Sequence, residues 1–426
     1  MSIILNIDDL SNDEREKINN DMTIKIENKM SFIPPRSFFL PEILNDTIYL
    51  PFAYSVNVLH KQRRNRKDFP EMIINFTGSL RDEQKIVKKE SIEHINKTGS
   101  VIISARTGFG KSILGLNIAY TIKLKTLIIV NKIILINQWK ESIDRFCPDA
   151  TVQKVVTKSK LQDCDFYIMN AINVKKMGST FFKDIGLCIC DEIHLLMAES
   201  LAKCLHFISP RYLIGLSATP YRPDGLDILL ELYFGKNKII RKMNRKHIIF
   251  QVNTGFVPKV ELTANGKINW GVILKSQSED EKRNCLIVKI IKEFPKRNFL
   301  VLTKRVEQAN ILVSKLKEID EYVTSLIGKE QEFDKEARIL VAISQKCSTG
   351  FDHPKMDTLI LCSDVEQYFI QSLGRIFRKE ESSPIVFDLL DDNPILLKHF
   401  KTRKQVYKEI GGIVKDFFKE FPEFKN

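Results

Sequence analysis

The residues from Ala105 to Ser112, which read ARTGFGKS, have the types and the spacing that phosphate binding requires. Gly108 and Gly110 allow the backbone to curl so that its N–H groups face phosphate oxygens. Lys111 can reach β- and γ-phosphates, and the hydroxyl of Ser112 can bind Mg²⁺. The run departs from the pattern G-x-x-x-x-G-K-S/T only where Ala105 replaces the first glycine. The remaining loop positions in this candidate nucleotide site are Arg106, Thr107 and Phe109.

Two adjacent carboxylates, Asp191 and Glu192, follow the apolar run LCIC later in the chain. Asp191 is expected at the carboxyl end of a strand, where ligands bind in parallel sheets and where a second Mg²⁺ ligand is needed. Glu192 could orient or deprotonate an attacking water. A surface Asp-Glu pair is the common alternative, and the preceding phosphate loop makes the catalytic interpretation more specific. We expect His194 to be a polar residue near the core and not a metal ligand.

Short apolar runs alternate with segments of helical spacing, which is typical of parallel strands covered on both faces. The first series of runs is VIISA (101–105), TLIIV (126–130), FYIMN (166–170), LCICD (187–191) and YLIGLSA (212–218). The second is NFLVLT (298–303), ARILVAI (337–343), DTLILCS (357–363) and PIVFDLL (384–390). The sequence therefore predicts an α/β protein with two tandem parallel-sheet domains.

The predicted organisation has five parts. They are an N-terminal accessory segment (1–75), a first α/β domain (76–240), a connector (241–280), a second α/β domain (281–395) and a helical tail (396–426). Four prolines in the accessory segment, Pro34, Pro35, Pro41 and Pro51, favour short strands and loops over long helices.

The chain has 426 residues and a net charge of +13, which favours polyanionic partners. No apolar run reaches the length of a membrane helix, since the longest, Leu127 to Ile136, contains Asn131 and Lys132. The N-terminus does not resemble a signal peptide, so we expect an intracellular protein. The dispersed cysteines predict reduced thiols and neither zinc nor disulfides. The basic segment 61–67 could contact phosphates or be a solvated linker, and the sequence leaves both open.

Several ordered motifs together resemble those of superfamily 2 helicases. After ARTGFGKS and DEIH come SATP (217–220), CSTGFD (347–352) and QSLGRIFR (371–378), and LRDEQ (80–84) precedes the phosphate loop. The resemblance covers about residues 76–392. Ile193 stands where the family has Ala or Cys, which leaves both carboxylates in place. The motifs are similar to those of the transcript-release DNA helicases of poxviruses and related large DNA viruses. They are also similar to those of XPB-type and phage branch-migration helicases.

This resemblance implies two RecA-like domains with ATP and Mg²⁺ bound between them. It implies that Gln84 contacts adenine and that Lys111, Asp191 and Glu192 act in catalysis. In the second half it implies an arginine finger, Arg378, supported by Arg375, and nucleotide contacts from Gly350 and Asp352. Coupling of hydrolysis to domain motion would fall to Ser217, Thr219 and Gln371.

The expected function is that of an ATP-dependent DNA helicase or translocase in transcription or genome maintenance. An RNA helicase and an ATP-switched nucleic-acid clamp that unwinds little remain alternatives. Expected partners are nucleic acid, with DNA favoured over RNA, and RNA polymerase or other transcription factors, but no membrane. The site of action would be cytoplasmic or nuclear and, for a viral protein, the cytoplasmic replication site or the virion.

Overall fold

The computed structural model describes residues 1–26, 36–156, 159–218, 226–328, 330, 332–347, 353, 355–365, 369–377 and 382–425. Four predicted site residues, Thr219, Gly350, Asp352 and Arg378, lie outside the described residues. The chain divides into two compact units. The first comprises Met1–Ala105 and Phe109–Arg241, and the second comprises Lys242–Asn426 together with Arg106–Gly108.

The first unit is built around a seven-stranded parallel sheet with the order β12-β6-β11-β10-β7-β9-β8. Its strands are β6 (Ser100–Ala105), β7 (Thr126–Val130), β8 (Val152–Val155), β9 (Phe166–Asn170), β10 (Leu187–Asp191), β11 (Tyr212–Ser217) and β12 (Lys238–Arg241). Five of these strands coincide with the first series of apolar runs, which confirms that part of the prediction. Because the strands are parallel, all their carboxyl ends lie at one edge of the sheet.

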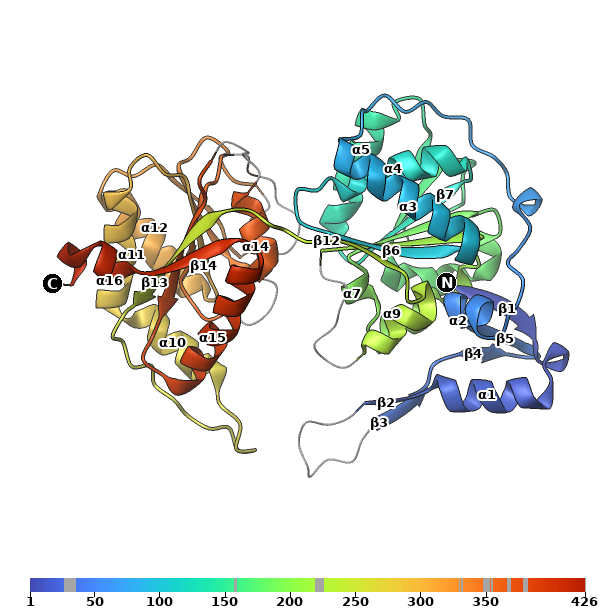
Figure 1. Cartoon of the computed structure of the whole chain (residues 1–426), viewed down its shortest axis with the longest axis horizontal. Coiled ribbons are helices and arrows are strands. Elements are labelled where there is room, and N and C mark those ends of the chain that lie inside the picture. Colours follow the sequence, from blue (N-terminus) through green and yellow to red (C-terminus); the bar gives the residue numbers. More distant parts are fainter. Residues whose placement is uncertain are drawn as a thin grey trace. The chain divides into compact units, whose positions relative to one another are not determined.

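Both faces of this sheet are buried, as the continuous apolar runs predict. The helices are α3 (Asp82–Thr98), α4 (Lys111–Ile122), α5 (Ile133–Phe146), α6 (Val174–Met177), α7 (Ile193–Leu196), α8 (Glu199–Cys204) and α9 (Asp227–Phe234). Val101 and Ile103 of β6 share a core with helices α3, α4 and α5, which lie on one face (Figure 1). Ile102, which points to the opposite face, shares a second core with α7 and α9.

The N-terminal segment packs on the face that carries α9. It contains a three-stranded antiparallel sheet with the order β1-β5-β4 and a two-stranded ribbon, β2-β3. The elements are β1 (Ser2–Asn6), α1 (Asn12–Met22), β2 (Thr23–Ile26), β3 (Arg36–Phe39), β4 (Glu42–Leu44), β5 (Thr47–Pro51) and α2 (Phe52–Asn57). The short strands were predicted, but helix α1 was not. Ser11 and Glu14 form a capping box at its start, and only Ile18 and Met22 are buried, so its apolar pattern is weak.

The second unit contains another seven-stranded parallel sheet, with the order β15-β16-β14-β17-β18-β13-β19. Its strands are β13 (His247–Asn253), β14 (Phe299–Thr303), β15 (Val323–Leu326), β16 (Ile339–Ile343), β17 (Thr358–Leu361), β18 (Ile385–Leu390) and β19 (Gly412–Asp416). Its helices are α10 (Trp270–Glu279), α11 (Glu281–Glu293), α12 (Val306–Glu318), α13 (Ser344–Cys347), α14 (Phe369–Ile376), α15 (Pro394–Glu409) and α16 (Phe417–Glu420). Helices α11, α12 and α16 bury one face of the sheet and α14 and α15 the other. The two sheets and their covering helices are those of tandem RecA-like domains, as predicted.

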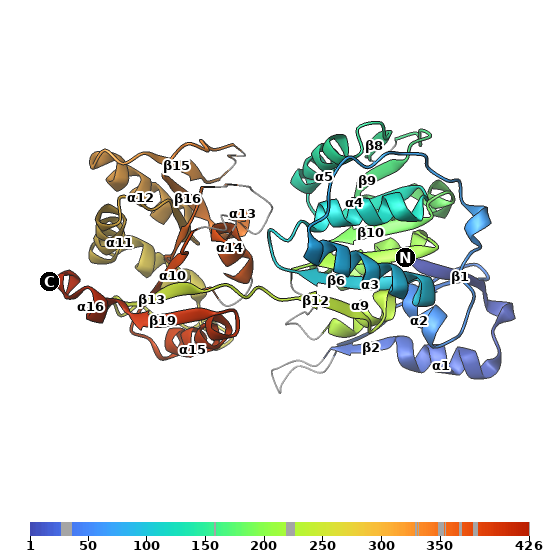
Figure 2. The same cartoon turned by 45° about the horizontal axis from the view of Figure 1, so that its top comes forward.

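Two strands of the second sheet come from residues that the sequence placed outside the second domain. Strand β13 lies in the predicted connector, and β19 lies in the tail, which was expected to be helical (Figure 2). β13 pairs with β18 and β19, so Ile248 lies opposite both Ile385 and Ile413. Because these partners are distant in sequence, a local apolar pattern cannot show that the two segments pair. The tail contains helices α15 and α16, as expected, but it also contributes strand β19, which was not predicted.

Short 3-10 turns complete the described backbone, at Ile7–Asp9, Arg66–Asp68, Ala171–Asn173, Ser179–Phe182, Leu205–Phe207 and Pro422–Phe424. Among the described residues, none of the helices combines the length and the apolar character that a membrane span requires. Five of the cysteines, at positions 147, 164, 188, 190 and 362, are buried.

Candidate nucleotide site

The phosphate loop connects the carboxyl end of β6 to the first turn of α4. Gly110 caps this helix with a φ of 84°, and a Cβ atom there would lie 2.5 Å from Nε2 of Gln84. Glycine is therefore required both for the left-handed backbone and for the close approach. The Nζ atom of Lys111 donates a hydrogen bond to the carbonyl of Ala105, 3.1 Å away. The N-terminus of α4 adds partial positive charge where phosphate would bind.

The start of α3 holds the phosphate loop through a single carbonyl group, that of Phe109. Gln84 Nε2 donates to this carbonyl at 2.7 Å, and the guanidinium of Arg81 donates to it as well. The other end of the Gln84 amide accepts from the backbone N–H of Arg81 at 2.8 Å. Gln84 is buried and its side-chain amide is bound to the loop. Its contact with adenine therefore stays a prediction, whereas its contact with the loop backbone is an added role.

Asp191 lies at the carboxyl end of β10, at the same edge of the sheet as the phosphate loop. Its two oxygens accept hydrogen bonds from Trp139 Nε1 at 2.9 Å and from the Glu192 backbone at 3.0 Å. Burial, together with the neighbouring negative charge of Glu192, raises the pKa of Asp191 to about 6, and Lys111 acts in the opposite direction. A buried carboxylate held by two donors beside a lysine can accept a divalent cation.

Glu192 has an unusual backbone, with a φ of 49° in the left-handed region. Non-glycine residues rarely adopt this conformation, and it occurs preferentially at functional sites. Its Oε2 atom is buried and has no hydrogen-bond partner among the described residues. The same atom lies 3.5 Å from Nδ1 of His194. A buried oxygen of this kind can accept a hydrogen bond from a water molecule.

His194 connects the DEIH segment to the next strand. Its Nδ1 atom lies 2.8 Å from the hydroxyl of Ser217, at the end of β11. Both side chains are buried, as expected for a polar residue near the core. The pair provides a direct contact between the carboxylate segment and the strand that leads to SATP, of which Thr219 is outside the described residues.

The residues at this edge of the first sheet fit ATP and Mg²⁺. The loop offers backbone N–H groups and Lys111 for phosphates, and Asp191 offers a buried carboxylate for a cation. Glu192 offers a buried oxygen that has no hydrogen-bond partner among the described residues and that can accept a hydrogen bond from water. Ser112 is placed in the first turn of α4 beside Lys111. The structure thus places the phosphate loop, Asp191, Glu192 and Ser217 at the same edge of the first sheet, and their individual contacts with nucleotide stay predictions.

In the second unit, Gln371 and Arg375 lie on helix α14 and both are buried. They are four residues apart, so they occupy the same side of the helix. Leu373 and Ile376 of the same helix belong to the apolar core against β17 and β18. This packing fixes the helix that carries Arg375.

Comparisons with known proteins identify the family. Residues 77–222 match the family described as "Type III restriction enzyme, res subunit". The chain is 42% identical to "Putative helicase 161L" of Invertebrate iridescent virus 6, over 98% of this chain and 100% of the relative. This chain belongs to the superfamily 2 helicases. The helicase is accordingly an ATP-hydrolysing enzyme with a tandem RecA-like fold.

Two more distant relatives of the helicase have names that indicate different nucleic acids. The "DNA 3'-5' translocase XPB2" of Sulfurisphaera tokodaii is 26% identical over 75% of this chain and 83% of the relative. The "Putative ATP-dependent RNA helicase L396" of Acanthamoeba polyphaga mimivirus is 26% identical over 95% of this chain and 84% of the relative. Among solved structures, Saccharomyces cerevisiae Dbp5 bound to RNA and ADP BeF3 has a TM-score of 0.55, 14% identity and coverage of 81% and 96%. This last similarity concerns the fold alone.

No role in the nucleotide site was predicted from the sequence for two of its side chains, Trp139 and Arg81. Trp139 is buried in helix α5 and donates a hydrogen bond to Asp191. Arg81 was part of the LRDEQ motif without a role of its own, and it binds the loop carbonyl. A single indole N–H on a buried helix face is the signal that could have identified Trp139, because buried Trp usually finds an acceptor.

Proposed function

We propose that the helicase couples ATP hydrolysis to movement along DNA. The observation that carries the proposal is the group at the edge of the first sheet, where Glu192 and Lys111 lie close enough to Asp191 for their charges to act on it, and where Lys111 donates to the phosphate loop at Ala105. Mg²⁺ bound there with ATP would neutralise charge that develops on the transferred phosphoryl group. The side chains of the protein would bind the phosphates, hold the cation and position the water.

In this proposal each side chain of the first unit has a separate role. Lys111 binds the β- and γ-phosphates, and Ser112 and Asp191 hold the cation. Glu192 positions the water and accepts its proton, because its Oε2 has no other hydrogen-bond partner in the described part of the chain. His194 and Ser217 transmit a change at Glu192 to strand β11, since they are in contact with each other and His194 also with Glu192.

In the second unit, Arg375 and Arg378 would stabilise the negative charge of the transition state. Loss of such an arginine typically lowers the rate about 10³- to 10⁵-fold. Gly350 and Asp352 would contact the nucleotide, and Gln371 and Thr219 would couple hydrolysis to motion. These assignments follow from the motifs that carry them.

DNA is the favoured track because the motif style resembles DNA translocases and because a relative named as a DNA translocase aligns with three quarters of the chain. A role in transcription, with RNA polymerase or another transcription factor as partner, follows from the likeness to transcript-release helicases. RNA is the second candidate track, since a relative named as an RNA helicase aligns with nearly the whole chain.

The test is steady-state ATP hydrolysis with Mg²⁺, first without nucleic acid and then with single-stranded DNA, duplex DNA or RNA. Lys111→Ala serves as the inactive control, and it should abolish turnover on every track. Strong stimulation by DNA and little by RNA would support the proposal. Stimulation by RNA alone would favour the RNA helicase, and binding of ATP without stimulated turnover would favour a nucleic-acid clamp.

A further inference from the structure

Two adjacent hollows on the first unit are lined by cations and lie away from the nucleotide site. They have volumes of about 460 and 480 Å³ and share Gln62 and Arg63. The charged residues that line the first are Lys61, Arg63, Lys97 and Arg211, and the second adds Arg64 and Lys183. Among the described lining residues of either hollow there is no carboxylate. We call these two hollows together the basic groove.

The basic groove lies at the opposite edge of the sheet from the phosphate loop. Arg211 directly precedes β11, and Arg63 packs against Gly99, which directly precedes β6. The phosphate loop follows the other end of β6. A strand of six residues is about 17 Å long, so the two sites are separated by the full height of the sheet. An anion in the basic groove therefore cannot be part of the ATP bound at the loop.

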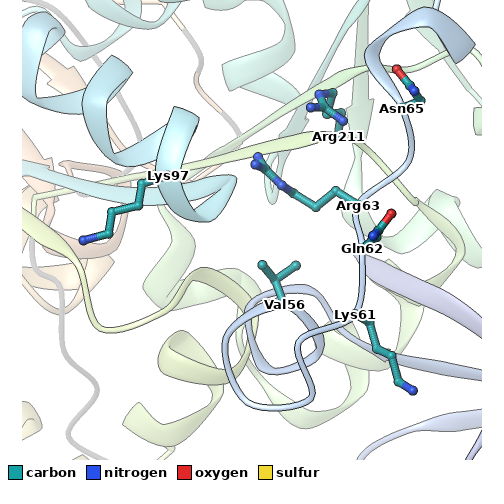
Figure 3. Close-up of a pocket in the computed structure, with 7 residues that line it drawn as sticks. All are labelled: Val56, Lys61, Gln62, Arg63, Asn65, Lys97 and Arg211. Carbon is teal, nitrogen blue, oxygen red and sulfur yellow. The ribbon is translucent and has the colours of Figure 1, made fainter.

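Arg63 is held in place by the end of helix α3. It donates to the carbonyls of Ile95 and Asn96, both at 3.2 Å, and so caps the C-terminus of the helix. Gly99 has a φ of 84°, and a Cβ atom there would lie 2.6 Å from Cδ of Arg63. Figure 3 shows Arg63 reaching from the segment that carries Lys61 toward the helix that carries Lys97, with Arg211 beside it.

No acid among the described residues neutralises the charge of the two central guanidinium groups, those of Arg63 and Arg211. Arg63 and Arg211 lie 5.6 and 5.3 Å from the centre of the Tyr212 ring. Burial, and then the positive charge of Arg211, lower the pKa of Arg63. No carboxylate among the described residues forms an ion pair with either guanidinium. A partly buried, unneutralised pair of this kind gains stability when an anion binds.

The surrounding cations differ in their availability. Lys61 already pairs with Glu14 at 2.7 Å, and the charges of Asp68 and Asp184 act on Arg64. Lys97 and Lys183 are exposed, and within the described chain neither has an ion-pair partner. Arg63 and Arg211 each use only part of their five N–H donors, on backbone carbonyls and the Tyr212 hydroxyl. Donors therefore remain at both arginines and both lysines.

We propose that the basic groove binds the sugar-phosphate backbone of nucleic acid. The two neighbouring hollows meet at Arg63. They fit a ligand with regularly repeated anionic groups better than they fit a single small anion. The ring of Tyr212 is buried, so it offers no surface on which a base could stack. Binding is therefore through phosphates and without sequence preference. The proposal rests on the nucleic-acid binding of a helicase and not on the choice between DNA and RNA.

The test compares two double variants of the full chain by fluorescence anisotropy. Lys97→Gln with Lys183→Gln removes two charges from the basic groove, and Lys17→Gln with Lys89→Gln removes two exposed charges from helices outside its lining. Affinity for single-stranded DNA, duplex DNA and RNA is measured without nucleotide at several salt concentrations. Hydrolysis of ATP without nucleic acid, measured in parallel, should be unchanged in both variants because neither touches the nucleotide site.

Each lost phosphate contact reduces the slope of log affinity against log salt by about 0.9 for duplex and about 0.7 for single strands. We expect the groove variant to lose about one to two contacts and to bind about tenfold more weakly at low salt, while the control variant stays near wild type. Arg63→Gln with Arg211→Gln should have a larger effect, provided that circular dichroism shows a folded chain. A second readout is competition by inorganic phosphate and by an acidic peptide.

Equal slopes in the groove and control variants would overturn the proposal. The proposal would also be overturned if the groove and control variants differed only in their competition by inorganic phosphate, which would indicate a small-anion site. A difference only in competition by the acidic peptide would overturn it as well. Equal losses on DNA and RNA would support recognition of the shared backbone. If hydrolysis without nucleic acid fails in wild type, the ATP proposal is at fault, and the binding comparison still tests the groove.

Discussion

The substitution Trp139→Phe tests whether the charge of Asp191 depends on its buried hydrogen bond. The indole N–H donates to Asp191 over 2.9 Å, and phenylalanine keeps an aromatic ring but has no donor. A hydrogen bond to a charged group contributes about 1.5–3 kcal/mol. One pKa unit corresponds to about 1.4 kcal/mol, so loss of the bond should raise the pKa by about one to two units.

The consequence for nucleotide binding follows from the sign of this shift. The pKa of Asp191 is already raised to about 6, so the carboxylate is mostly ionised at neutral pH and loses its charge as the pH falls through that value. In the variant, protonation should begin about one to two pH units higher. Affinity for Mg²⁺ and ATP at pH 7 should then fall about two- to tenfold and recover at pH 9.

The measurement is calorimetric titration with Mg²⁺ and a non-hydrolysable ATP analogue between pH 5.5 and 9. Trp270→Phe is the matched control, because Trp270 is the second of the two tryptophans and lies in the other unit. Thermal melting reports the packing that both substitutions remove. The electrostatic reasoning is wrong if the affinity of Trp139→Phe falls over the same acidic pH range as that of wild type. It is also wrong if the affinity of the variant is reduced equally at every pH.

Three further predictions concern other parts of the helicase. Glu192→Gln should retain ATP binding and lose turnover at least a hundredfold, since an amide cannot accept the proton of water; a nucleotide titration showing lost binding would contradict this role. Ser217→Ala removes the hydroxyl that contacts His194, so it should reduce the stimulation of ATP hydrolysis by nucleic acid several-fold while basal hydrolysis is retained. Unchanged stimulation in the same assay would exclude the coupling role. Asp388→Asn leaves the buried guanidinium of Arg403 with one less counter-charge and should lower the free energy of unfolding by about 3–5 kcal/mol in urea titrations. The substitution Asp392→Asn, at an exposed position, is the control and should have little effect. Equal unfolding midpoints for the two variants would contradict the prediction.

The sequence predicted the elements whose signal is local. Runs such as LCICD and VIISA are apolar throughout because both faces of each sheet are covered, and this property is visible in a window of five residues. The phosphate loop and the acidic pair were recognisable because phosphate and cation chemistry permits few residue types at each position.

What the sequence could not show depends on contacts between distant segments. Trp139 and Asp191 belong to different elements, and only the packing of α5 on the sheet brings the indole N–H to the carboxylate. The basic segment 61–67 was open to two interpretations because its charges are alike. The structure distinguishes its members: Lys61 pairs with an acid, whereas Arg63 caps a helix and lies beside Arg211.

The position of β13 has a consequence for the synthesis of the chain. β13 is the first strand of the second sheet to leave the ribosome, yet its partners are β18 and β19, which are made more than a hundred residues later. Throughout that interval the apolar segment HIIFQVN has no strand to pair with. Strands in this condition are prone to mispairing between chains. Nascent chains of the helicase should therefore depend on chaperones most strongly between the translation of β13 and that of β18.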